Sequence, residues 1–240
     1  MALWFIKGKY ENKPVYHLMG GNFHKTITPY ASLQPLGSSF EEYRDSLVEW
    51  AEKARNLGFR AVKSEVTMNG PYAHNGMEEN DEKHTLVLEA VRKALGPEIK
   101  LMVDVQYKWK TAEDALRTVK DWEEFDIYFL ETPVWTDSLE DYARMHEEAP
   151  MKIAAGEWLS TSHEFYDLIT KGKIDVAQPD IGRVGGLTEA KKVSKLADQF
   201  DRIIVPHCWK TSISISATAH FAFNTPSCKF IEYLPPQLCH

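Results

Sequence analysis

The sequence predicts an α/β fold of the TIM type, a (β/α) barrel with eight parallel strands. Short apolar segments rich in β-branched residues alternate with longer amphipathic segments, and the alternation continues until eight strand candidates have been counted. Such alternation predicts parallel strands joined by helical crossovers. Eight units predict a closed barrel, and a length of 240 residues is close to the usual size of that fold.

The expected elements follow one another in strict order. Gly58 ends the first expected helix, and the pair Gly96-Pro97 ends the second. No helix is expected after the last strand, and the irregular segment 67–79 is expected to be a loop at the active-site end. The strands are expected at 27–33, 59–66, 100–105, 127–131, 152–155, 175–178, 202–205 and 229–233, and the helices at 40–57, 80–95, 111–125, 138–148, 161–170, 187–200 and 211–223.

Composition and charge exclude several classes of protein. The net charge of −7 argues against a nucleic-acid partner, because phosphate binding needs clustered Lys and Arg. No apolar run is long enough to span a bilayer, and the N-terminus lacks a signal-peptide pattern, so no membrane partner is expected. The three cysteines form no CxxC pair and no disulfide framework. A cytoplasmic location is therefore expected.

Three carboxylates end successive strands of the predicted barrel. Asp104, Glu131 and Glu157 are 27 and 26 residues apart, which is about one strand-helix unit each. Catalytic side chains of a barrel come from the carboxyl ends of its strands, so these three would converge. Converging carboxylates repel one another unless a cation is present, and oxygen ligands suit Mg²⁺. A structural network of salt bridges is the competing interpretation.

Asp180 and His207 end the next two expected strands. A carboxylate beside an imidazole fixes its tautomer and raises its pKa, which makes the imidazole a better base. A single His before a Trp is commonly a packed or surface residue. Its place one strand after Asp180 favours a catalytic role for His207.

The sequence resembles the mandelate racemase-like branch of the enolase superfamily, which includes muconate lactonizing enzymes. The resemblance covers nearly the whole chain from Ala2 onward. The strongest part is the run Gln-Pro-Asp followed by Arg-Val-Gly-Gly-Leu-Thr. The matching segments are 102–104, 131–133 (Glu-Thr-Pro), 155–157 (Ala-Gly-Glu), 178–180 with 183–188, 205–207 (Val-Pro-His) and 231–233.

The resemblance implies a magnesium enzyme that removes the proton next to a carboxylate. Bound Mg²⁺ would stabilise the resulting enediolate, with His207 as the base and Asp180 orienting it. The small-molecule carboxylate would be held by Glu232 and by Lys63 on the second strand. The implied metal ligands are Asp104, Glu131 and Glu157.

The second strand departs from the family pattern. Many members carry Lys-x-Lys there, the second Lys being a base on the opposite face, whereas this chain has Lys63-Ser64-Glu65. Glu65 could act as a base, bind a substrate hydroxyl or pair with Lys63. The change weakens a two-base racemase interpretation and favours dehydration that depends mainly on His207.

Dehydration of a sugar acid to a 2-keto-3-deoxy acid is the function we expect, which makes the chain a Mg²⁺-dependent hydro-lyase. The loop at 67–79 and the ending after Glu232 resemble the rhamnonate dehydratase-like group. Tyr72, His74 and Asn75 are expected substrate-binding residues, with ordinary loop polarity as the alternative. A racemase, epimerase or cycloisomerase of the same superfamily, or a truncated inactive metal-binding barrel, are the alternative functions.

The resemblance also implies a division of the chain into two parts. Residues 1–25 resemble the end of the α+β capping region that precedes the barrel in family members. Residues 26–240 form the expected catalytic barrel, without the capping domain and without the last helix. A homo-oligomer is expected for the full-length protein.

Overall fold

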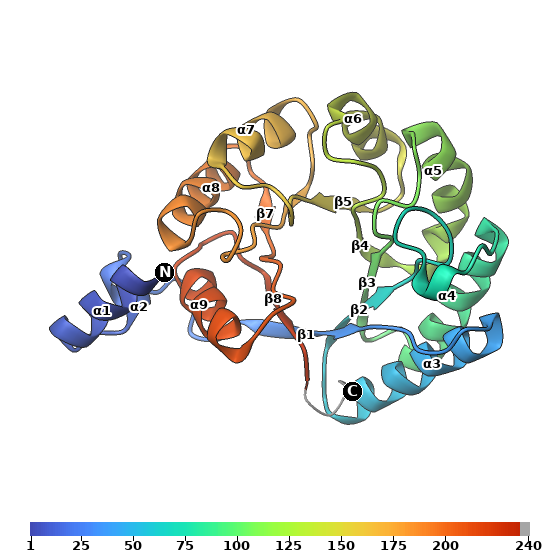
Figure 1. Ribbon diagram of the computed structural model, residues 1–240, viewed down its shortest axis with the longest axis horizontal. Coiled ribbons are helices and arrows are strands. Elements are labelled where there is room, and N and C mark those ends of the chain that lie inside the picture. Colours follow the sequence, from blue (N-terminus) through green and yellow to red (C-terminus); the bar gives the residue numbers. More distant parts are fainter. Residues whose placement is uncertain (236–240) are drawn as a thin grey trace.

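A ring of eight strands surrounded by helices forms the computed structural model, which describes residues 1–235 (Figure 1). All neighbouring strands are parallel, in the order β7-β6-β5-β4-β3-β2-β1-β8. A parallel bridge between Ile204 of β7 and Cys228, two residues before β8, nearly closes the ring. The predicted barrel is therefore confirmed. Its strands are β1 (Thr28–Leu33), β2 (Ala61–Glu65), β3 (Lys100–Asp104), β4 (Ile127–Glu131), β5 (Lys152–Ala155), β6 (Val176–Ala177), β7 (Ile203–Ile204) and β8 (Phe230–Tyr233).

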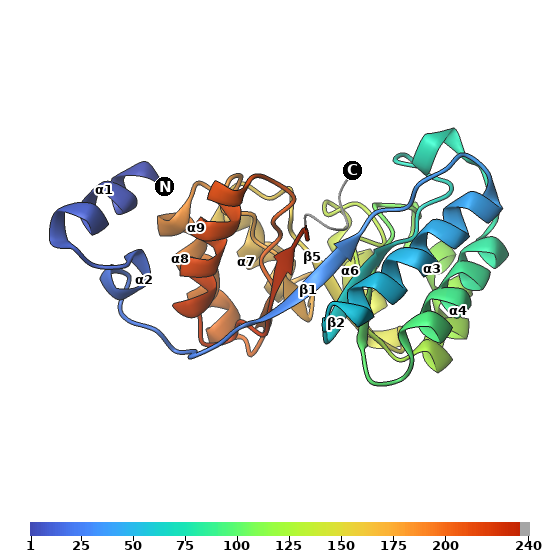
Figure 2. The same cartoon turned by 90° about the horizontal axis from the view of Figure 1, so that it is seen from below.

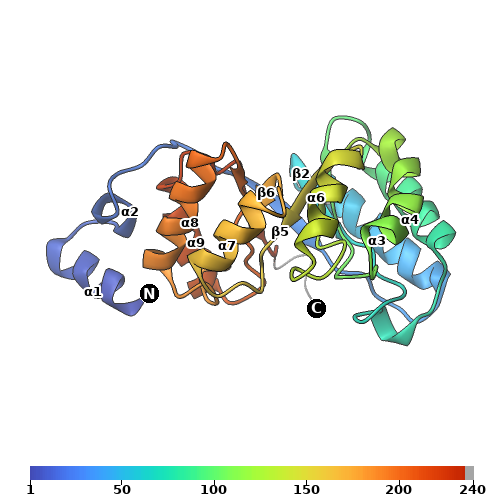
Figure 3. The same ribbon diagram turned by 90° about the horizontal axis from the view of Figure 1, so that it is seen from above.

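Seven α-helices lie outside the strands, one after each of β1 to β7 (Figure 1). Figure 2 shows β1 crossing between the side that holds α8 and α9 and the side that holds α3 and α4. Figure 3 shows the opposite side, where α6 and α7 are neighbours. Within residues 1–235, α9 contacts β8 and α3 contacts β1, and no further helix lies between α9 and α3. The helices are α3 (Phe40–Asn56), α4 (Asp81–Leu95), α5 (Ala112–Val119), α6 (Leu139–Glu148), α7 (Ser162–Thr170), α8 (Leu187–Gln199) and α9 (Ser212–Phe223).

Side-chain caps fix where several of these helices begin. The Ser39 hydroxyl accepts from the backbone of Glu42, and Thr161 does the same for Glu164, in two complete capping boxes. Each cap satisfies backbone N–H groups that the helix leaves unpaired and contributes about 1 kcal/mol. The expected helix at 111–125 divides into α5 and a 3₁₀ helix, η2 (Lys120–Phe125), because the tighter turn begins at Lys120.

The barrel interior is filled by one apolar side chain from each strand or its immediate end. Strand side chains alternate between the two faces of the sheet, so the residue two positions further along also points inward. On β2, β3, β4 and β8 that next residue is charged, which places charged groups on top of an apolar layer at the carboxyl ends of the strands. The layer consists of Tyr30, Ala61, Met102, Phe129, Ala154, Val176, Val205 and Phe230.

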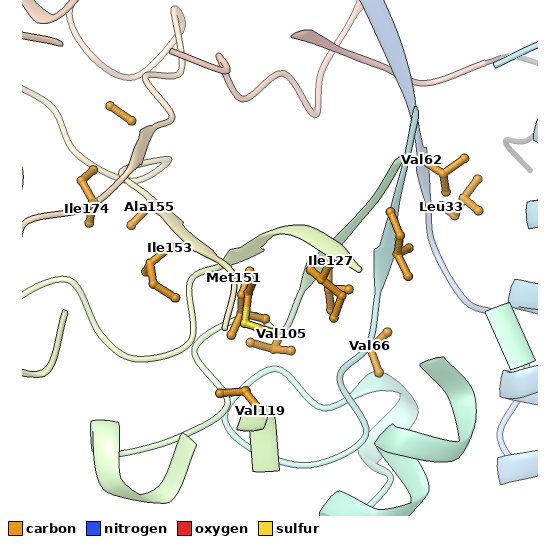
Figure 4. Close-up of a cluster of buried hydrophobic side chains, with 14 of the residues drawn as sticks. Leu33, Val62, Val66, Val105, Val119, Ile127, Met151, Ile153, Ala155 and Ile174 are labelled. Carbon is orange, nitrogen blue, oxygen red and sulfur yellow. The ribbon is translucent and has the colours of Figure 1, made fainter. Parts of the chain in front are cut away.

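A second core lies between the strands and the helices. Outward-facing residues such as Val62 on β2 and Ile153 on β5 are fully buried there (Figure 4). Val119 at the end of α5 is buried in the same core. Because this shell packs against both layers, it fixes the strand ends at which the polar residues stand.

Residues 1–25 contain two helices that the sequence did not predict, α1 (Ala2–Glu11) and α2 (Val15–Leu18). They lie beside α8 and α9, outside the ring (Figure 1). Trp4 Nε1 donates to Thr188 Oγ1 at 2.9 Å, and Asn224 Nδ2 donates to the Gly21 carbonyl at 2.7 Å. The origin of this segment in a capping region stays a prediction. The last five residues of the expected barrel domain, 236–240, lie outside the described part.

A buried ion pair anchors the start of α4. Lys108, with a side chain only 1% exposed, contacts Asp81 Oδ1 through Nζ at 2.7 Å. Asp81 Oδ2 accepts from Trp109 Nε1 at 2.9 Å and from Thr118 Oγ1 at 2.6 Å. Burial opposes ionisation, but these hydrogen bonds and Lys108 lower the pKa of Asp81 to about 2.

In residues 1–235, no helix combines the length and apolar character needed to cross a membrane.

Candidate active site

A cavity of about 200 Å³ opens at the carboxyl ends of the strands. Its wall also includes residues of the segments that follow β1, β3, β5, β6 and β7, which is the end where barrel enzymes hold their active sites. Two further predicted residues, Glu131 and Asp180, lie behind the wall and contact residues in it. The predicted site residues that line the cavity are Lys63, Glu65, Tyr72, Asp104, Glu157, His207 and Glu232.

Lys63 lies at the floor of the cavity and is surrounded by carboxylates. Its Nζ is 2.9 Å from Glu131 Oε2, 3.0 Å from Glu232 Oε1 and 3.8 Å from Asp104 Oδ2. Burial opposes the charge, but Glu131 and Glu232 outweigh burial and hold the pKa of Lys63 well above its usual range. Lys63 is therefore a fixed positive charge beneath the site.

Asp104 and Glu131 are buried acids that neighbouring side chains hold in place. Asp104 Oδ1 accepts from the Gln106 backbone N–H at 2.9 Å and from Thr132 Oγ1 at 3.1 Å. Glu131 Oε2 accepts from Gln178 Nε2 at 2.6 Å. Burial raises the pKa of both acids, and the neighbouring carboxylates raise it further, while Lys63 lowers it. The net result is a pKa of about 7 for Asp104 and about 8 for Glu131.

Glu157 completes the predicted metal ligands, and its oxygens face two other residues. Glu157 Oε1 accepts from the Tyr107 hydroxyl at 3.2 Å, and Oε2 is 3.1 Å from His207 Nε2. Within the described chain, no three acidic, His or Cys side chains already form a metal-binding group. The donor chemistry nevertheless fits Mg²⁺, because all three ligands are carboxylates and the raised pKa values of Asp104 and Glu131 reflect negative charge that burial disfavours.

The pair predicted from Asp180 and His207 is formed. His207 Nδ1 lies 2.8 Å from Asp180 Oδ2, while Asp180 Oδ1 accepts from Lys210 Nζ at 2.6 Å and from the Gly182 N–H at 2.7 Å. Burial raises the pKa of Asp180, but the hydrogen bonds from His207 and Lys210 prevail and lower it to about 2. An ionised Asp180 can only accept, so the proton of neutral His207 resides on Nδ1 and leaves Nε2 as the basic atom.

The Nε2 side of His207 faces two carboxylates. Glu157 Oε2 is 3.1 Å away and Glu232 Oε2 is 4.0 Å away. Burial lowers the pKa of His207, but Glu232, Asp180 and Glu157 raise it by more, so the net shift is upward. Glu232 is fixed by the Cys208 N–H, which donates to Oε2 at 2.6 Å. Against the effect of burial, Lys63 and His207 lower the pKa of Glu232 to about 2.

Glu65 lies in another part of the cavity wall and is held much less firmly. Among residues 1–235, its carboxylate has no hydrogen-bond donor and no ion-pair partner within 4 Å, and only its backbone carbonyl accepts a bond, from Tyr43 at 3.1 Å. Burial is the main reason that its pKa is raised to about 7, with Lys63 opposing and Glu157 adding to the shift. Glu65 can therefore exchange a proton near neutral pH.

Two of the expected substrate-binding residues lie away from the cavity. Asn75 Nδ2 donates to the Gly37 carbonyl, and the ring of His74 lies against that of Tyr43 at 5.5 Å. The loop at 67–79 contains a short 3₁₀ helix, η1 (His74–Gly76), which orients both side chains toward these neighbours. Of the three loop residues, only Tyr72 reaches the cavity.

Several wall residues were not predicted. Tyr107 stacks on Trp135 with ring centres 4.6 Å apart, and it follows Gln106 in a left-handed turn with φ values of 46° and 59°. Arg183 lies over the ring of Trp158 at 3.8 Å. The period-two alternation of strand side chains cannot predict Tyr107 or Arg183, because both follow the end of a strand. Gln178, two residues before Asp180, carried a usable signal, since alternation places both on one face.

Comparisons with known proteins identify the family and several relatives. Residues 46–238 match a family model described as enolase C-terminal domain-like. Two relatives are each 32% identical over 94% of this chain, the D-galactarolactone cycloisomerase of Agrobacterium fabrum over 227 residues and the arabinonate dehydratase of Saccharolobus solfataricus over 234. The chain spans 57% of the length of each.

Solved structures share the fold. The 3,6-anhydro-D-galactonate cycloisomerase from Zobellia galactanivorans is 34% identical with a TM-score of 0.85, over 98% of this chain and 61% of that one. An enolase from Bradyrhizobium, complexed with magnesium and mandelic acid, is 28% identical with a TM-score of 0.81, over 97% and 58% of the two chains.

Proposed function

Because the chain belongs to the enolase superfamily, in the family of mandelate racemase and muconate lactonizing enzymes, we propose that it is a Mg²⁺-dependent acid-sugar dehydratase. The observation that supports this most is the geometry of His207. Its Nδ1 is fixed by Asp180 at 2.8 Å, and its Nε2 is directed toward the carboxylates of the cavity. This arrangement suits a residue that removes one proton from one face of a bound substrate.

We assign the metal to Asp104, Glu131 and Glu157. When bound, Mg²⁺ supplies positive charge beside the substrate carboxylate. Lys63 and Glu232 complete the charged surroundings of that carboxylate. Since Lys63 contacts both Glu131 and Glu232, it balances their charge and keeps them in place between turnovers.

Proton transfer involves His207 and its partners. Nε2 accepts the α-proton, and the Asp180 carboxylate stabilises the imidazolium that forms. Lys210 and the Gly182 N–H hold Asp180 still during this step. The imidazolium then returns its proton to the departing β-hydroxyl, and the enol product tautomerises to a 2-keto-3-deoxy acid. Tyr72 is the loop residue that we assign to a substrate hydroxyl.

Epimerisation or cycloisomerisation is the second candidate, and Glu65 is the observation that favours it. A carboxylate in the cavity wall with a pKa of about 7 and no side-chain partner could act as a second base. Two of the similar proteins named above are cycloisomerases. Solvent deuterium incorporated into recovered substrate, without loss of water, would support this candidate over dehydration.

The test is a panel of aldonic and aldaric acids incubated with the protein and Mg²⁺. We expect a 2-keto-3-deoxy product from at least one acid, detected by NMR, and no product when a chelator removes the metal. Binding of an acid with no turnover of any substrate would contradict the proposal and support a barrel that only binds metal. Full turnover in excess chelator would contradict the assigned role of Mg²⁺.

A further inference from the structure

Arg183 is a cation of the cavity wall whose hydrogen-bonding capacity is mostly unused. Its Nη1 donates to the Glu157 carbonyl at 3.3 Å and lies 3.7 Å from Glu157 Oε2. Nε and Nη2 have no acceptor within the described residues. The side chain is 29% exposed and lines the cavity.

The guanidinium is held in a fixed orientation. It lies over the ring of Trp158 at 3.8 Å, and its residue belongs to a turn closed by two bonds to the Asp180 carbonyl, from Arg183 N at 3.0 Å and Val184 N at 2.8 Å. A stacked guanidinium in a rigid turn loses little freedom when a ligand binds. The turn also carries Asp180, so the orientation of Arg183 is tied to that of the proposed base.

The other cations of the cavity are already neutralised. Lys63 contacts three carboxylates, and His207 lies between Asp180 and Glu157. Arg183 is therefore the cation of the described wall that retains free donors for a second anion.

We propose that Arg183 binds a second carboxylate of the substrate, so that the acid sugar is a dicarboxylic acid. The inference rests on the proposed function, which places the first carboxylate at the metal. A planar guanidinium presents paired N–H groups that match a carboxylate better than a single hydroxyl.

The experiment measures binding without turnover. Adipate and hexanoate share a six-carbon chain and differ in the second carboxylate, and neither has a hydroxyl to lose. Calorimetry at constant ionic strength with Mg²⁺ present would compare wild type, R183M and R183K. R117M is the matched control, because Arg117 is a surface residue of α5 that is 67% exposed and pairs with Glu113.

We expect wild type and R117M to bind adipate at least about tenfold more tightly than hexanoate, and R183M to lose that preference while its hexanoate affinity changes less than about twofold. R183K keeps the positive charge but loses the planar arrangement of N–H groups, so its preference for adipate over hexanoate should lie between those of wild type and R183M. No preference in wild type, or equal loss of both acids in R183M, would overturn the proposal. Because neither probe can be dehydrated, a diacid preference without any dehydratase activity would refute only the proposed function.

Discussion

Two side chains of the cavity wall that can take up a proton, His207 after β7 and Glu65 at the end of β2, are held very differently. His207 is fixed through Nδ1 by Asp180, which is itself fixed by Lys210 and a backbone N–H. Glu65 has a raised pKa of about 7 but no side-chain partner in the described structure.

The difference bears on the roles proposed for the two residues. A base must keep its atom within reach of one proton, and a chain of hydrogen bonds provides that positioning for His207. Glu65 shows that a shift caused mainly by burial can raise the pKa of an acid to about 7 without fixing the direction of its side chain. In this cavity, a raised pKa and a fixed side-chain orientation therefore have different causes.

The largest expected effect on activity comes from replacing His207. H207N should lower kcat by about 10³-fold, because the amide cannot accept the α-proton at neutral pH. Turnover of the best acid of the substrate panel is the measurement. H220N is the matched control, since His220 lies on α9 against Phe5 and outside the cavity wall. A variant at position 207 with full activity would remove the base from the mechanism.

A smaller effect on activity is expected from replacing Glu65. E65Q should lower the rate of dehydration by less than about tenfold, because the amide keeps the size of the side chain and loses only its proton exchange. Deuterium incorporation into recovered substrate should fall to background in this variant if Glu65 delivers a proton. A loss as large as that in H207N would show that the two sides are equally catalytic and would favour epimerisation.

The smallest effect on chemistry is expected from a site remote from both sides. D81N should leave kcat within about twofold of wild type but lower the free energy of unfolding by about 2 kcal/mol, because buried Lys108 loses its charged partner. The Asp81 contribution is fully present above the unfolded pKa of about 4 and is lost as pH falls toward the folded pKa of about 2.

Denaturation curves of both proteins test the Asp81 prediction. The stability gap between wild type and D81N should be constant above about pH 5 and should shrink between about pH 4 and pH 2. A gap that does not change with pH would show that the carboxylate contributes packing or neutral hydrogen bonds in place of charge.

The strand-end residues could be predicted because parallel strands bring their carboxyl ends to one rim. Asp104, Glu157, His207 and Glu232 follow from counting strands and from period-two alternation. The roles assigned to these residues remain predictions, since they rest on resemblance and geometry.

Side chains beyond the strand ends could not be placed in the same way. Tyr107 enters the cavity wall through consecutive left-handed residues, and Asn75 turns away to the Gly37 carbonyl, which is 38 positions distant in sequence. Loop conformation of this kind depends on contacts with segments that are distant in the sequence. The helices α1 and α2 were missed for a related reason: α1 has largely exposed apolar residues such as Leu3 and Tyr10, so its pattern does not indicate a buried face.

The junction between β7 and β8 joins the proposed site to the closure of the barrel. In the described chain, an isolated bridge pairs Ile204 of β7 with Cys228, two residues before β8, and the Cys208 N–H, beyond β7, donates to Glu232 on β8. The Glu232 carboxylate, which we assign to substrate binding, therefore also connects the two strands that close the ring. Amide hydrogen exchange should be faster at this junction than along the longer ladders between β1 and β4, and replacement of Glu232 should weaken barrel closure as well as the proposed activity.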